Sequence, residues 1–259
     1  MKKTILTSLF CIYALLNQAA AAENADAPAA ENADAPAAEE ATPAAETPVT
    51  PDRAKVKKKS DPCKRFQGLK PVLRLRSSYG KLSYNYDYDR DNLDIMAERS
   101  RLTEEGMFTA GLSLVDVDWS VSLNTVSRSV EGQICIIPAS VDIFVGYRNP
   151  VIYIGNDLER NSCAYQVVLR HERQHQQVNI AVLDYYLPVL KKGFEEQLPI
   201  LKVRTLQENE DTDGVTDEMN AEYAEAIRPL INRFQITLQL EQQRLDNREN
   251  YQYESRLCR

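Results

Sequence analysis

The chain has only two histidines, and they lie four residues apart in the stretch His171-Glu172-Arg173-Gln174-His175. On a helix, residues i and i+4 share one face, so both imidazole rings can reach one metal ion. Zinc suits imidazole ligands, and a catalytic zinc site keeps three protein ligands and one open position for water. The ion lowers the pKa of that water to roughly 7, and Glu172 can accept its proton. The spacing therefore predicts a zinc site with Glu172 as general base. The competing interpretation is an ordinary polar helix face.

The third zinc ligand must be a different kind of residue, because the chain has no further histidine. A carboxylate is the expected substitute. If two long helices fold back around residue 211, position 173 lies opposite roughly 249, which brings Asp246 and Glu249 to the histidines. These two carboxylates share a helical face, so one could bind zinc while the other orients a histidine. Glu241 is a further candidate, whereas Glu222 and Glu225 would lie roughly 40 Å along the helix from the histidines.

Two other stretches could serve a hydrolytic site. Tyr251 follows the candidate carboxylates, and its hydroxyl could stabilise an oxyanion near zinc, with core packing as the alternative role. The stretch VIYIGND, residues 151–157, could be an edge strand that binds an extended peptide through main-chain hydrogen bonds. It could equally be an interior strand.

The N-terminus indicates export. Lys2 and Lys3 precede an apolar run over residues 5–16, and small residues follow as far as Ala22. This is the pattern of a signal peptide over residues 1–22, and the apolar run is too short to be a transmembrane helix. We therefore expect a periplasmic or secreted protein whose mature form has no transmembrane segment.

Export changes how the cysteines are interpreted. Four of them lie outside the expected signal peptide, and an even number in an oxidising compartment predicts two disulfides, with three pairings open. The same helical fold-back places Cys163 opposite about residue 259. A Cys163–Cys258 disulfide is therefore expected, which leaves Cys63 to pair with Cys135.

Residues 23–62 are of low complexity and contain the repeat AAENADAP twice in tandem. Alanine, proline and acidic residues cannot bury a core, so this stretch is expected to be a disordered tether with a basic end. The basic residues over 53–65 could contact an anionic envelope surface weakly, or simply form a solvated linker. The net charge of −7 gives no reason to expect nucleic-acid binding. Residues 63–259 are expected to form one domain.

The elements that must position the site fall into two halves. Strand patterns run from about 69 to 155, and VDVDWSVSL alternates apolar and polar residues cleanly. Leu73 and Leu75, with the alternating tyrosines 84–88, suggest an early hairpin around Gly80. From Cys163 the apolar spacing becomes helical, with Ser162 or Asn161 as the cap. A turn over 207–215 leads to a second long helix. The pattern predicts an α+β fold: an antiparallel or mixed sheet followed by an antiparallel helical hairpin.

The HERQH helix resembles the zincin class of metallopeptidases. More closely, the order Trp119, Cys135, His171–His175 and Asp246 resembles a group of small exported bacterial proteins regarded as zinc-dependent peptidases, whose function is not known. The resemblance covers about residues 110–259, and it implies zinc binding through both histidines and a base role for Glu172. No G-x-x-H extension follows His175, so the metzincin pattern is absent.

The expected function is hydrolysis of peptide bonds in a peptide or protein substrate, by zinc-activated water with Glu172 as general base. The alternative is a non-catalytic cell-envelope binding protein, stabilised by disulfides, in which the zinc site is structural or vestigial. Acidic, tethered, disulfide-bonded domains suit such a binding role as well.

Overall fold

The structure is a computed structural model that describes residues 6–7, 61–99, 109–207 and 209–258. The elements over these residues belong to one compact unit, formed by Met1–Leu15 and Pro62–Arg259. The described pair Leu6–Thr7 belongs to the expected signal peptide, whose other residues lie outside the described ones. The tether as far as residue 60 and most of the basic cluster also lie outside them.

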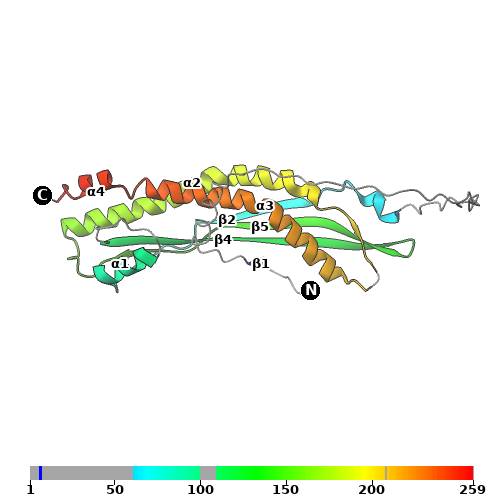
Figure 1. Ribbon diagram of the computed structural model, residues 1–259, viewed down its shortest axis with the longest axis horizontal. Coiled ribbons are helices and arrows are strands. Elements are labelled where there is room, and N and C mark those ends of the chain that lie inside the picture. The colour runs from blue at the N-terminus through cyan, green and yellow to red at the C-terminus, as the bar shows by residue number, and fades with distance from the viewer. Residues whose placement is uncertain (1–5, 8–60, 100–108, 208, 259) are drawn as a thin grey trace, which may run out of the picture. The chain divides into compact units, whose positions relative to one another are not determined.

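A mixed β-sheet forms one layer of this unit (Figure 1). Its centre is a long antiparallel hairpin of β4 (Gly111–Val130) and β5 (Gln133–Ile154). The short strands β1 (Leu6–Thr7) and β6 (Arg204–Thr205) pair antiparallel with β4 and β5, respectively. By contrast, β2 (Val72–Ser78) and β3 (Ser83–Asn85) both pair parallel with β5. The predicted α+β fold with a mixed sheet is confirmed.

One detail of the strand prediction is wrong, and one of two open alternatives is confirmed. The stretches around Leu73 and Tyr84 do not form a hairpin, because both run parallel to β5 instead of pairing with each other. The stretch beginning at Val151 is an interior strand, because it pairs with β3 on one side and with β4 on the other. It belongs to β5, which continues through Asn149 with a φ of 47° at that residue. An Asn-Pro pair that resembles a turn in sequence is therefore a local irregularity inside a long strand.

The helices follow from capping and apolar spacing. Helix α2 (Cys163–Gln197) is capped by Ser162, whose side chain accepts a hydrogen bond from the Tyr165 backbone N–H. Helix α3 (Thr212–Gln243) is capped in the same way by Asp211. A short 3-10 helix over Leu198–Ile200 follows the end of α2. Within the described part of the chain, the other helical segments are α1 (Arg90–Arg99), α4 (Arg248–Glu254) and the 3-10 helix Pro62–Phe66.

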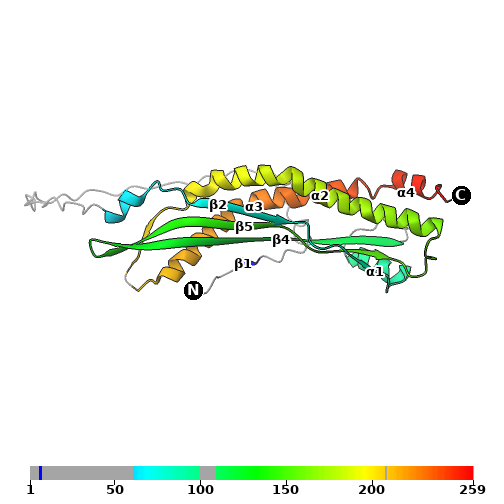
Figure 2. The ribbon, with the colours of Figure 1, turned by 180° about the vertical axis from the view of Figure 1, so that it is seen from behind.

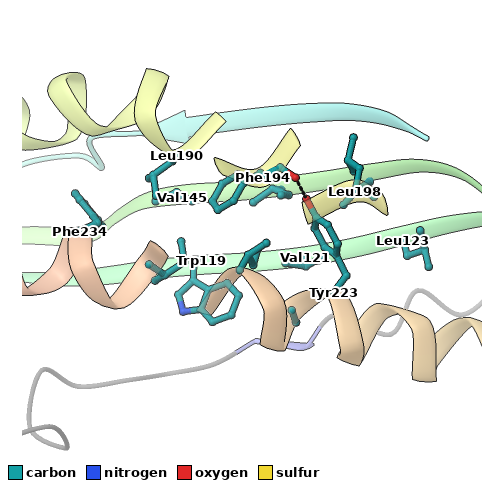
Figure 3. Packing of buried hydrophobic residues seen from close by; sticks show 14 of the residues in the cluster. Trp119, Val121, Leu123, Val145, Leu190, Phe194, Leu198, Tyr223 and Phe234 are labelled. Atoms are coloured by element: carbon teal, nitrogen blue, oxygen red, sulfur yellow. Dashed lines mark hydrogen bonds between the residues drawn. The ribbon is translucent and has the colours of Figure 1, made fainter. Parts of the chain in front are cut away.

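Helices α2 and α3 lie antiparallel on one face of the sheet, as the two opposite views show (Figures 1 and 2). The alternate residues Val117, Trp119 and Val121 of β4 point into a core shared with both helices. Figure 3 shows this packing, in which the Tyr223 hydroxyl donates a 2.7 Å hydrogen bond to the Phe194 carbonyl oxygen. The buried hydroxyl is thereby satisfied while its ring fills the space between the helices.

Both expected disulfides are present. Cys63 pairs with Cys135, and Cys163 pairs with Cys258 across a sequence separation of 95. Closing a loop of this length is worth roughly 3–5 kcal/mol in chain-entropy terms. Among the described residues, no helix is long and apolar enough to cross a membrane.

Candidate metal centre

The two histidines meet an aspartate from the far end of the helical hairpin. His171 and His175 lie one turn apart on α2, and Asp246 lies in the link that joins α3 to α4. Asp246 Oδ1 is 3.1 Å from His171 Nε2 and 3.1 Å from His175 Nε2. The two Nε2 atoms are also 3.1 Å apart. These three side chains form a group that could hold a metal ion.

The spacing of the three atoms fits a small divalent cation. Ligands arranged tetrahedrally at about 2.0–2.1 Å from zinc lie about 3.3 Å from one another. The observed separations of 3.1 Å are close to this value. Two imidazoles and one carboxylate are also a common donor set for a catalytic zinc ion.

The contacts behind the two rings indicate which ring nitrogens face the centre. The Gln242 amide donates to Asn179 Oδ1 at 2.6 Å and to the His175 carbonyl at 3.2 Å. Its Oε1 is therefore left to accept from His175 Nδ1, so Nδ1 carries the proton in the neutral ring. Similarly, His171 Nδ1 faces Glu254 Oε2 at 3.0 Å. In their neutral form with the proton on Nδ1, both rings would direct an Nε2 lone pair at Asp246 Oδ1. Three lone pairs this close repel unless a cation or a proton lies between them.

The histidines and Asp246 shift one another's pKa values. Burial alone would lower the pKa of His175, but its hydrogen bond with Asp246 and the charge of that carboxylate raise it to about 9. Burial would raise the pKa of Asp246, but hydrogen bonds with both histidines hold it well below its usual range. Asp246 is therefore an ionised carboxylate at neutral pH, and the centre favours positive charge.

Glu172 is buried beside the centre, against the first residue of β4. Burial raises the pKa of Glu172 to about 7, in spite of His175 and His171, which lower it. A Cβ atom at Gly111 would lie only 2.8 Å from both Cγ and Oε1 of Glu172. Glycine at this position lets the β4 backbone approach the Glu172 carboxyl closely. A side-chain bond between Gln176 and Ser113, 2.7 Å long, fixes α2 on the same part of β4.

Three further residues contact the group of His171, His175 and Asp246, and the sequence did not predict these contacts. Gln242 and Glu254 contact the rear nitrogens of the histidines, as described above. Tyr251 donates a 2.6 Å hydrogen bond to Asp246 Oδ1, so its hydroxyl is directed at one of the three candidate ligand atoms. In the sequence, only its spacing from Asp246 indicates that Gln242 lies near the centre: the two residues are four apart, about one helical turn.

The other candidate carboxylates lie elsewhere. Glu249 is exposed in the first turn of α4, because α3 ends at Gln243 and Asp246 is not on a continuous helix with it. The expectation that the two carboxylates share a helical face is therefore wrong. Glu241 pairs with Arg244, Glu225 with Arg228, and Glu222 with Arg204.

Comparison with known proteins adds no relative: no protein-family model, curated protein or solved structure matches the chain.

Proposed function

We propose that the protein is a zinc-dependent peptidase whose metal ligands are His171, His175 and Asp246. The observation that carries the proposal is the convergence of two imidazole Nε2 atoms and one carboxylate oxygen, each 3.1 Å from the others. A bound zinc ion would supply activation of water and polarisation of a substrate carbonyl. Two imidazoles and a carboxylate leave room for such a reaction, because catalytic zinc keeps a position free of protein ligands.

The proposed role of Glu172 is proton transfer. A general base works best when its pKa is near the pH at which it operates, and burial raises the pKa of Glu172 to about 7. In this role the carboxylate accepts a proton from the attacking water and then delivers it to the amine that leaves. Its burial beside the histidines supports the assignment.

An extended peptide could bind along β4. Among the described residues, the outer edge of β4 from Gly111 to Trp119 has no strand partner, since β1 pairs only at Ser120 and Val121. Unpaired main-chain groups at a sheet edge can bind an extended peptide by adding a strand. This edge begins beside Glu172, so a peptide bound there would pass close to the proposed base.

The compartment is part of the proposal. Disulfides persist mainly in oxidising compartments, and the chain has two. Together with the expected signal peptide, this supports a periplasmic or secreted protein that acts on peptides or proteins outside the cytoplasm.

Metal removal tests the proposal directly. Purified protein is expected to contain one zinc ion per chain and to cleave members of a mixed peptide library. A chelator should abolish cleavage, and added zinc should restore it. Protein that binds zinc but cleaves nothing in the library would support the alternative of a binding protein with a structural zinc site.

The role of Tyr251 is a separate prediction. Because its hydroxyl donates to Asp246, Tyr251→Phe is expected to weaken zinc binding about 10-fold, the lower end of the usual range for contacts that orient a ligand. A hydroxyl that stabilised an oxyanion would behave differently: its loss would lower kcat by about 10²–10³ at saturating zinc. Zinc titration and kcat measured on the same variant separate these two roles.

A further inference from the structure

The C-terminal segment contacts the metal centre through side chains of the short helix α4. Helix α4 has seven residues, and Glu254 is its one buried residue. Beyond it, Cys258 forms a disulfide with Cys163, the first residue of α2. Figures 1 and 2 show α4 beside the N-terminal half of α2, the arm that carries both histidines. A helix this short does not hold its position without such tertiary contacts.

Two residues of this segment reach the centre: Tyr251 donates to Asp246, and Glu254 lies against His171. Glu254 is the one that contacts a rear ring nitrogen. Its Oε2 lies 3.0 Å from His171 Nδ1, and its Oε1 lies 3.7 Å from Arg170. His171 Nδ1 is buried, and among the described residues it has no well-aligned hydrogen bond, so the Glu254 carboxylate is the group in reach that can hold this ring. A carboxylate behind a metal-binding histidine fixes the ring's orientation and raises its basicity.

The disulfide keeps Glu254 within reach of His171. Cys163 and His171 belong to the same rigid helix, and only a few residues separate Glu254 from Cys258. The covalent bond thus makes docking of Glu254 an intramolecular event with a short tether and a small entropy cost. Cys163 and Cys258 are both exposed, whereas the other disulfide joins two buried cysteines. The exposed bond is therefore the one that a dithiol can attack first.

We propose that the Cys163–Cys258 disulfide is a latch that holds the positioning residue Glu254 on His171, and that opening the latch weakens metal binding at the centre. The inference rests on the proposed zinc site. In the opening step a dithiol reductant attacks one sulfur, and a mixed disulfide forms and resolves. The Cys163–Cys258 bond takes up two electrons and two protons to give two thiols, while the reductant becomes a disulfide.

Zinc affinity of four proteins tests the latch without any assay of hydrolysis. They are the wild type, Cys163→Ser/Cys258→Ser, Glu254→Ala, and the combination of all three substitutions. Loss of the Cys163–Cys258 disulfide or of the Glu254 carboxylate is expected to raise the zinc Kd about 10–100-fold. Because the latch acts through Glu254, the combination should be no weaker than Glu254→Ala alone. Glu254→Gln, which keeps an acceptor oxygen, should recover part of the loss.

The second disulfide provides the matched control. Cys135 lies opposite Arg128 on β4, roughly 55 Å along the strand from Gly111. Cys63→Ser/Cys135→Ser should therefore leave the zinc Kd of the folded protein unchanged. If serine variants of the latch do not fold, mild reduction of the wild type followed by alkylation with an uncharged reagent opens the exposed bond in the folded protein.

The outcomes separate the latch from the proposed function. An unchanged zinc Kd in folded protein with the latch open overturns the latch and leaves the peptidase proposal standing. Additive losses in the combined variant overturn the route through Glu254. A zinc Kd that depends on the latch supports the inference even if the protein hydrolyses no peptide, a result that would count against the peptidase proposal alone.

Discussion

Glu172→Gln is expected to abolish peptide hydrolysis while leaving the zinc content unchanged. The amide has nearly the volume of the carboxyl group but cannot accept a proton, and loss of a general base lowers kcat by about 10²–10⁴. Burial raises the pKa of Glu172 to about 7, so the site already tolerates the neutral form of this side chain. The variant should therefore fold like the wild type. Zinc stoichiometry and kcat, measured on the same preparation of the variant, test whether activity is lost while zinc stays bound.

A matched control is available on the same helix. Glu195 is exposed on α2, and Glu195→Gln makes the same chemical change away from the centre. It should retain full activity. If Glu172→Gln keeps its kcat, Glu172 is not the base. If it loses zinc as well as activity, Glu172 supports the metal centre instead of the chemistry.

The centre was predictable from sequence to the extent that it depends on helical register. His171 and His175 share a face because they are four residues apart, and fold-back of two long helices brings Asp246 to them. The same argument pairs Cys163 with Cys258, as the structure confirms. These predictions succeed because α2 and α3 are long and begin with strong capping residues, Ser162 and Asp211.

Helical register no longer predicts which residues share a face beyond residue 243, where α3 ends. Extending α3 past residue 243 placed Glu249 on the face of Asp246, but the chain leaves the helix and starts α4 at Arg248. Glu254 was missed for the same reason, because its position depends on that break and on the disulfide beyond it. In the sheet, parallel pairing of β2 and β3 with β5 joins segments far apart in sequence, and local alternation carries no information about such partners.

Asp246→Ala is expected to weaken zinc binding by more than about 100-fold, because removing a ligand should cost at least as much as removing a residue that only orients one. Asp246 Oδ1 is the atom on which both Nε2 atoms converge. Without it two imidazoles remain, and the centre loses the ionised carboxylate that offsets the charge of the cation. Competition with a chromophoric chelator at fixed pH measures the change.

Glu249→Ala is the control that separates loss of a metal ligand from loss of negative charge. Both substitutions remove one carboxylate from the same short stretch, so they change the net charge and the local field by similar amounts. Glu249 is exposed, and its removal should leave the zinc Kd within about 2-fold, since exposed charges act weakly through solvent. Equal losses in the two variants would mean that general negative charge attracts the cation. A loss confined to Asp246→Ala would mean that the position of one oxygen atom, set by the end of α3, determines metal binding.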